Sequence, residues 1–302
     1  MRDSPIEAAT IAVPDPRRAS VFADYLALTK PRLNLLVVAT RAAGYYLGTT
    51  GATDVVSMAE AVVGTALVAG GAAVLNQLYE RDTDALMRRT RLRPLPAGRV
   101  TPNDARIFGM ALSAAGLVLL AARANWLSAA LALATLLTYL AIYTPMKRRT
   151  PLSTIVGAVP GALPALIGWT ASRGRVDLSG AALFAIVFCW QLPHFMAIAW
   201  LYRDDYAKAG FPMLPVIDPD GRRAGKQAVY WGFLLLLVSV APTFTGLAGT
   251  FYGVVALVLG AALFWLAARF AGARNEATAR ALFFGSITYL PLLWIAMIAN
   301  KQ

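Results

Sequence analysis

The sequence predicts an all-α, polytopic membrane protein with nine transmembrane helices. Two observations predict this class. The 302 residues are 58% hydrophobic and only 15% charged, whereas about 25% of the residues of soluble domains are charged. The apolar residues also gather in long blocks, near the ~20 residues that an α-helix needs to cross a bilayer. Nine such blocks in series exclude a soluble helical protein.

The predicted spans follow one another with short connections. They are residues 33–50, 58–79, 104–122, 126–144, 153–170, 179–201, 229–247, 250–272 and 280–299. The first is the weakest, because Arg41 lies inside it. The longest connection, about 202–228, is too short to build a soluble core. Residues 25–302 are therefore expected to form one membrane-embedded domain. Residues 1–24, which lack the apolar core of a secretory signal, are expected to be a disordered cytoplasmic tail.

The formal net charge of +12 would suggest nucleic acid in a soluble protein. Here the basic residues gather in alternate loops. They are Arg2, Arg17, Arg18, Lys30 and Arg32; then Arg81, Arg88, Arg89, Arg91, Arg93 and Arg99; then Lys147, Arg148 and Arg149; then Arg203, Lys208, Arg222, Arg223 and Lys226; and Arg269, Arg274 and Arg280. This is the positive-inside pattern. It predicts a lipid bilayer rather than a nucleic acid as partner, with the N-terminus in the cytoplasm.

An acidic string stands where the second span ends, within NQLYERDTDALMRR. Asn76, Glu80 and Asp84 are four residues apart, so an α-helix would place their side chains on one face. Such oxygens suit Mg²⁺, which commonly shares its ligands with substrate phosphates. Asp82 falls on another side of an ideal helix and is the weaker ligand. The alternative is a helix end that forms salt bridges with the arginines that follow.

A second polar cluster follows the sixth span and faces the same compartment. Asp204 and Asp205 begin this loop, and either could join the metal site or pair with Arg203 and Lys208. His194 is the only histidine of the chain. An intramembrane imidazole can carry protons or bind a metal, or it can simply be a hydrogen-bonded core residue. The single cysteine, Cys189, excludes a disulfide framework.

The cationic side chains near the acidic string are suited to phosphate oxygens. The candidates for binding a diphosphate are Lys30, Arg89, Thr90, Arg93, Lys147 and Arg148. For most of the loop arginines, contact with anionic lipid headgroups is the simpler interpretation. Arg89, Arg93 and Lys147 differ, because they lie where a diphosphate would meet both protein and Mg²⁺.

Several motifs resemble those of the UbiA superfamily of intramembrane prenyltransferases, and within it the branch that farnesylates haem. The matching strings are Leu28-Thr29-Lys30-Pro31-Arg32, Asn76-x-x-x-Glu80-x-Asp82-x-Asp84-x-x-Met87-x-Arg89-Thr90-x-x-Arg93-Pro94, Tyr143-Thr144-Pro145-Met146-Lys147-Arg148, Trp190-Gln191-Leu192-Pro193-His194-Phe195, and Asp205-Tyr206 followed by Gly210-Phe211-Pro212-Met213-Leu214-Pro215. Together they extend from about residue 25 to 215. The last three spans match only in number and apolar character.

The resemblance implies a nine-helix bundle around a central cavity that opens to lipid. It implies that Asn76, Glu80 and Asp84 hold Mg²⁺ against farnesyl diphosphate, and that His194 acts with the porphyrin. The aromatic-acceptor relatives carry a second pair of aspartates four residues apart. Here Leu201 stands four before Asp205, so Asp205 alone is expected to join the metal site.

The activity implied is transfer of the farnesyl group to a vinyl group of haem b at a bacterial inner membrane, giving haem O, with the site towards the cytoplasm. Haem b is then a substrate, and haem A synthase or a terminal oxidase is an expected partner. Two alternatives remain. One is a sister prenyltransferase acting on an aromatic acceptor such as 4-hydroxybenzoate or a chlorophyllide. The other is a transporter or lipid-binding bundle, which should show repeat symmetry and broken helices.

Overall fold

The computed structural model describes residues 20–302, and most of the expected N-terminal tail lies outside them. The described part is helical, without a β-strand. Its elements are α1 Val21–Leu28, α2 Pro31–Gly48, α3 Val55–Tyr79, α4 Arg81–Leu86, α5 Pro102–Arg123, α6 Trp126–Leu137, η2 Thr138–Tyr143, α7 Thr144–Met146, α8 Ser153–Arg173, α9 Leu178–Leu201, α10 Arg203–Lys208, α11 Leu214–Ile217, α12 Arg222–Ser239, α13 Ala241–Phe244, α14 Thr250–Ala273 and α15 Glu276–Ala299.

A long helix or helix pair lies at every predicted span, and the all-α membrane class is confirmed. Eight of these are long and apolar enough to cross a membrane. Helix α2 is not among the eight. Arg32, Asn34 and Arg41 lower its hydropathy, and Arg41 is the residue for which the sequence predicted this span to be the weakest. The sixth and seventh spans are confirmed as α9 and as α12 followed by α13.

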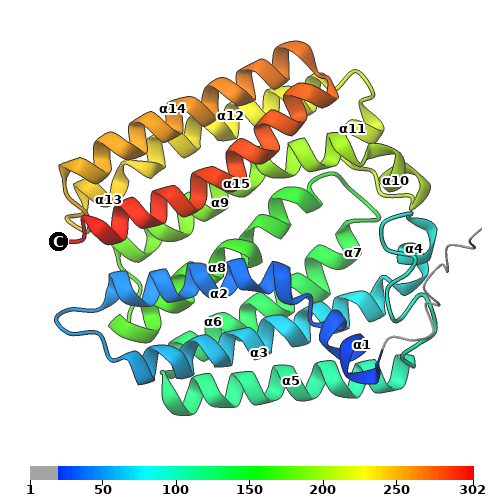
Figure 1. The fold of residues 1–302 in the computed structure, drawn as a ribbon, viewed down its shortest axis with the longest axis horizontal. Coiled ribbons are helices and arrows are strands. Elements are labelled where there is room, and N and C mark those ends of the chain that lie inside the picture. Colours follow the sequence, from blue (N-terminus) through cyan, green and yellow to red (C-terminus); the bar gives the residue numbers. More distant parts are fainter. Residues whose placement is uncertain (1–19) are drawn as a thin grey trace, which may run out of the picture.

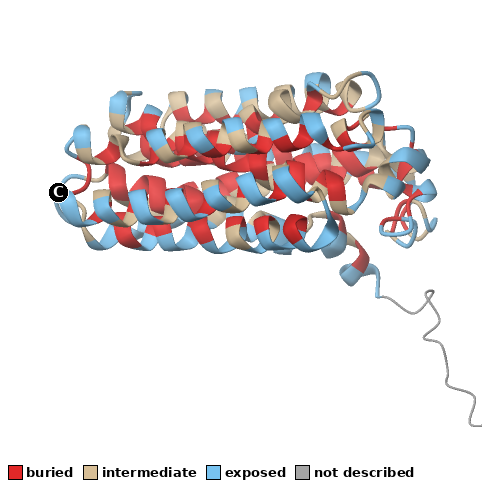
Figure 2. Cartoon of the chain, turned by 90° about the horizontal axis from the view of Figure 1, so that it is seen from above, coloured by how far each residue is buried: buried red, intermediate tan, exposed pale blue. Residues whose placement is uncertain are grey.

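The long helices lie side by side, and their short connections divide between two ends of the bundle (Figure 1). At one end lie α4, α7, α10 and α11. At the other end lie the C-terminus, α13 and the connection from α2 to α3. Buried residues line the inward faces of the helices, and exposed residues cover the outer faces (Figure 2). The two acidic clusters, in α4 and α10, therefore lie at the same end of the bundle.

Side-chain caps fix where several long helices begin. Asp54, Asn125, Asp177 and Asn275 precede α3, α6, α9 and α15, and each side chain accepts a hydrogen bond from a backbone N–H three residues later. A cap of this kind satisfies backbone donors that the helix leaves unpaired. The N-termini of these four helices are thus determined by capping residues.

Glycines let α2 cross α8 at close range. A Cβ at Gly44 would lie 2.3 Å from the carbonyl oxygen of Ala165, and one at Gly168 would lie 2.2 Å from that of Arg41. Small residues at such positions are how membrane helices gain packing contacts without a hydrophobic driving force. The crossing fixes α2, and with it the position of Lys30 at the N-terminal end of that helix.

The structure differs from the sequence prediction at residues 21–24, which were expected in the tail. They belong to α1, which Ser20 caps by accepting a hydrogen bond from the backbone of Ala23. Asp24 is 5% exposed, and its carboxylate accepts hydrogen bonds from Arg99 Nε at 3.0 and 3.1 Å. This partly buried ion pair attaches α1 to the segment that carries Arg99. The two residues are 75 positions apart, so the sequence around Asp24 does not predict the contact.

We expect Gly168→Ala to destabilise the protein by about 1–3 kcal/mol, because the new methyl group overlaps a backbone carbonyl that cannot move freely. Unfolding in detergent, followed by circular dichroism, measures the change. Gly272→Ala is the matched control, since nothing lies within 4 Å of its Cβ position in α14. The control should be neutral or stabilising by about 0.5–1 kcal/mol. Equal effects at both glycines would contradict the close crossing.

Candidate active site

The three residues of the acidic column keep their helical spacing, although the helix breaks between them. Asn76 lies in the last turn of α3, Glu80 is the junction with backbone angles outside the helical region, and Asp84 lies in α4. The Glu80 N–H donates to Asn76 O at 2.9 Å, and the Asp84 N–H donates to Glu80 O at 2.7 Å. The four-residue spacing therefore continues through the break.

The amide of Asn76 is held by two neighbours from the η2–α7 segment. Tyr139 donates its hydroxyl to Asn76 Oδ1 at 3.2 Å, and Asn76 Nδ2 donates to Thr144 Oγ1 at 3.1 Å. Thr144 Oγ1 in turn donates to Tyr139 O at 2.7 Å. Thr144 follows Tyr139 by five positions, which is the spacing of the i to i+5 hydrogen bonds in a π-helix. The π-helical turn η2 therefore places both residues on the side that faces Asn76. Such turns often occur at functional sites.

Neither Tyr139 nor Thr144 was predicted from the sequence to contact the column. A signal was present: Tyr139, Tyr143 and Lys147 are four residues apart, so they form a polar stripe along an apolar span. The Lys147 ammonium lies 4.5 Å from the centre of the Tyr143 ring. The π-helical register, however, does not follow from the periodicity of the sequence.

Both carboxylates of the column already face a cation. Lys147 Nζ donates to Glu80 Oε1 at 2.8 Å, with side chains 13% and 11% exposed. Arg93 Nη1 donates to Asp84 Oδ2 at 2.7 Å, and the Asp84 side chain is only 2% exposed. These pairs bring Lys147 and Arg93 to the column.

Lys30 completes the cationic group from the N-terminal end of α2. Its backbone is left-handed at φ 50° and directly precedes Pro31, a conformation that is costly for a residue with a side chain. Burial, with repulsion from Arg93 and Lys147, lowers the pKa of Lys30 to about 7, while Glu80 and Asp84 oppose the shift. A strained backbone thus holds a lysine among two further cations and two acids.

The oxygen donors of the column suit a divalent cation. Glu80 Oε2 and Asp84 Oδ1 accept no hydrogen bond from the described residues, and neither atom is sealed in the interior. One oxygen of each carboxylate therefore remains for an ion such as Mg²⁺, and Asn76 Oδ1 adds a third donor. Within residues 20–302, no cluster of three His, Cys, Asp or Glu side chains forms a metal site by itself.

The two remaining acids that were predicted as metal ligands, Asp82 and Asp205, are not part of the buried column. The Asp82 side chain is 88% exposed and pairs with the neighbouring Arg81 at 3.0 Å. Asp205 is half-buried in α10 and has no ion pair or side-chain hydrogen bond within the described residues. Met87 packs with Phe211 and Met213 in a small core. The two acidic loops are thus in contact, and Asp205 is brought to the same end as the column.

Of the other predicted diphosphate ligands, Thr90 lies behind the column, and Arg89 and Arg148 lie on its rim. Thr90 is buried, and its hydroxyl donates to the backbone oxygen of Asp84 at 2.7 Å, so it supports the column from behind. Arg89 is exposed and stacks over the Tyr202 ring at 4.9 Å. Arg148 is exposed at the end of α7. Arg89 therefore joins the two acidic loops, while Arg148 extends the cationic rim.

His194 lies apart from the column, in α9 against α15. Its Nδ1 is 2.7 Å from Ser286 Oγ, and its ring stacks on Trp190 and on Phe283 at 5.1 and 5.2 Å between centroids. The nearby Gln191 donates to the carbonyls of Ala158 and Val187. The structure thus gives His194 a defined orientation, and Ser286 is its partner from the far end of the sequence.

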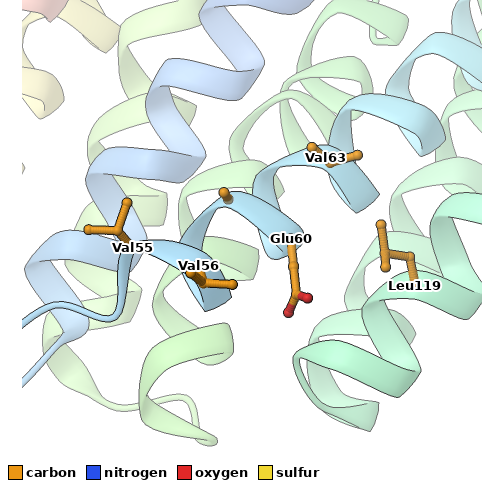
Figure 3. A pocket seen from close by; sticks show the side chains of 6 residues that line it. Val55, Val56, Glu60, Val63 and Leu119 are labelled. Carbon is orange, nitrogen blue, oxygen red and sulfur yellow. The ribbon is translucent and has the colours of Figure 1, made fainter.

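A surface pocket far along α3 is a different feature. It has a volume of about 390 Å³ and is lined by Val55, Val56, Ala59, Glu60, Val63 and Leu119 (Figure 3). Its one charge, Glu60, is paired with Arg123 at 2.6 Å. None of the residues lining this groove belongs to the acidic column or to its cationic partners.

The whole chain matches known proteins. The model of the UbiA prenyltransferase family matches residues 37–290. The chain belongs to this family. It is 44% identical over 287 residues to the protoheme IX farnesyltransferase of Solibacter usitatus, covering 92% of this chain and 98% of that one. It is 46% identical to the protoheme IX farnesyltransferase of Opitutus terrae, covering 95% and 97%.

Solved structures share the UbiA fold. A digeranylgeranylglyceryl phosphate synthase superposes with a TM-score of 0.79 at 18% identity, covering 92% of this chain and 98% of that one. A UbiA homologue from Archaeoglobus fulgidus, bound to DMAPP and Mg²⁺, superposes with a TM-score of 0.66 at 19% identity, covering 91% and 99%. These similarities confirm the predicted all-α membrane fold.

We expect binding of a prenyl diphosphate to take up close to one proton above pH 7. Above pH 7 Lys30 is largely neutral, because its pKa is about 7, and binding of an adjacent diphosphate should restore its charge. Affinity should then fall by up to about tenfold per pH unit above 7. Below pH 7 Lys30 is already charged and contributes no uptake.

Calorimetry of a non-hydrolysable prenyl diphosphate analogue at pH 8, in buffers of different ionisation enthalpy, counts the protons. Lys30→Met is the control, because the variant lacks the lysine amine that would take up a proton. Any proton uptake by the diphosphate itself would remain. Equal proton uptake by both proteins would contradict the assignment to Lys30.

Proposed function

We propose that this chain transfers the farnesyl group of farnesyl diphosphate to a vinyl group of haem b and, after addition of water, releases haem O. The observation that carries the proposal is the charge balance of the site. Three cations, Lys30, Arg93 and Lys147, gather around two acids, Glu80 and Asp84. Burying a net positive charge is expensive, so the group suits an anion as large as a diphosphate.

Asn76, Glu80 and Asp84 would hold Mg²⁺, with Asp205 approaching from the other loop. When bound, the ion supplies further neutralisation of charge on the leaving group. Lys30, Arg93 and Lys147 bind the non-bridging oxygens of the diphosphate and stabilise the charge that develops as it departs. The rim residues Arg89 and Arg148 attract the diphosphate to this end of the bundle.

The reaction breaks the bond between farnesyl C1 and the diphosphate oxygen and forms a bond from C1 to a vinyl carbon of the porphyrin. The second vinyl carbon is left as a cation stabilised by the ring, and water adds to it and releases a proton. The bundle keeps the reactive farnesyl cation away from bulk water. Tyr139 and Tyr143, beside Asn76 and Lys147, present π faces that favour positive charge nearby. No protein nucleophile is needed, and we expect no covalent enzyme intermediate.

We further propose that the chain lies in a bacterial inner membrane with its N-terminus and this site on the cytoplasmic side. The exposed arginines near the column support that orientation, since positive charge favours cytoplasmic loops. They include Arg88, Arg89, Arg91, Arg148 and Arg149. Haem A synthase or a terminal oxidase is the expected recipient of the product, because haem O is too apolar to leave the membrane readily.

Incubating membranes that contain the protein with haem b, farnesyl diphosphate and Mg²⁺ tests the activity. Mass spectrometry should show a haem heavier by one farnesyl group and one water. Farnesylation of 4-hydroxybenzoate or a chlorophyllide, with haem b left unchanged, would instead identify a sister prenyltransferase. If haem b, 4-hydroxybenzoate and the chlorophyllide all remain without a farnesyl group, the proposal is overturned.

Asp84→Ala should lower kcat by about 100-fold or more, because it removes a metal ligand and leaves Arg93 without its partner. The protein should still insert, since α3 and α5 keep their apolar contacts. Asp204→Ala is the matched control: its side chain is 87% exposed at the same end of the bundle, and its activity should stay near that of the native protein. Normal turnover by the Asp84 variant would show that the column is structural.

A further inference from the structure

The hydrogen bonds of Ser286 determine which nitrogen of His194 carries the proton. Ser286 Oγ donates its single hydrogen to Phe283 O at 2.7 Å. His194 Nδ1 also lies 2.7 Å from Ser286 Oγ. Because the carbonyl already takes the hydroxyl hydrogen, Nδ1 must be the donor in that contact. A neutral imidazole with its proton on Nδ1 carries its lone pair on Nε2.

Neighbouring side chains fix the plane of the His194 ring. Trp190 and Phe283 stack on it with interplanar angles of 18° and 20°. Trp190 Nε1 donates to Ser286 O at 2.7 Å, which ties the same serine to α9 a second time. The tautomer and the orientation of the imidazole are therefore both set before any ligand arrives.

The Nε2 atom has no partner, yet it is accessible. It makes no hydrogen bond with any described residue, and it is absent from the unpaired atoms sealed in the interior, which include Trp200 Nε1 and Arg41 Nε. An accessible lone pair on a half-buried imidazole within a membrane helix bundle is suited to a ligand with an electron-pair acceptor. An Nδ1–H bonded to an oxygen, with Nε2 free, is the usual arrangement of a histidine that binds a metal.

We propose that His194 Nε2 is the axial ligand of the haem b iron while haem is bound as substrate, and that Ser286 is the positioning residue for that bond. The inference rests on the proposed function, which makes haem the acceptor. His194 precedes the end of α9 at Leu201 by seven residues, about 10 Å along the helix. A porphyrin held by its iron at that depth would have to extend towards the acidic column for its vinyl edge to meet C1.

The test uses the full chain in detergent and haem b alone, followed by absorption spectroscopy of the ferric and ferrous forms. The native protein should give the spectrum of histidine-ligated haem. His194→Gly should lose it while binding a prenyl diphosphate analogue as before, and added imidazole should restore it. Ser286→Ala should raise the Kd for haem about tenfold, and Ser286→Thr, which keeps the hydroxyl, should recover most of the affinity.

Ser113→Ala is the control for removing a buried helical hydroxyl, because Ser113 Oγ donates only to Gly109 O of its own helix. It should leave the spectrum and the Kd unchanged. A haem spectrum that is the same in the native protein and in His194→Gly would overturn the ligation, even if haem O is still made. A histidine-type spectrum without any haem O formation would support the ligation and reject the proposed activity, so the two failures are distinguishable.

Discussion

The pairing of acids with cations at one end of the bundle is the constraint on which the rest of the site depends. Glu80 and Asp84 would repel each other as neighbouring carboxylates, and Lys30, Arg93 and Lys147 would repel each other as buried cations. Together they tolerate burial, because each acid has a cation within 2.8 Å. In the function that we propose, a diphosphate with a divalent ion would take over these partners, so the paired charges are already arranged for such a ligand.

Rigid parts far from the chemistry hold that arrangement in place. The crossing of α2 over α8 at Gly44 and Gly168 sets the position of Lys30, and the break at Glu80 turns α4 so that Asp84 meets Arg93. The π-helical turn η2 then brings Tyr139 and Thr144 to the amide of Asn76. Each device uses backbone geometry rather than a long flexible side chain, which limits the entropy lost when the ligand binds.

The sequence predicted the features that depend on local pattern. The spans followed from apolar length, and the column followed from four-residue spacing, which survived the helix break because the i to i−4 hydrogen bonds continue through Glu80. It could not predict contacts between distant segments. The Asp24–Arg99 pair, the bond from Tyr139 to Asn76 and the bond from His194 to Ser286 each join residues more than 60 positions apart. Periodicity carries no information about such contacts, and a family motif reveals only the residues that it contains.

Intramembrane polar groups are commonly taken as functional, and this bundle shows why accessibility has to be added to that rule. Arg41 is completely buried and donates to Thr65, while its Nε and Nη2 are buried without a partner among residues 20–302. No ligand can reach those atoms, so Arg41 is a cost to the stability of α2. The Nζ atom of Lys30, at the start of the same helix, and Nε2 of His194 are not among such sealed atoms. The combination of an unsatisfied group and an open approach is what separates a binding residue from a buried defect, and it applies to both substrates of this site.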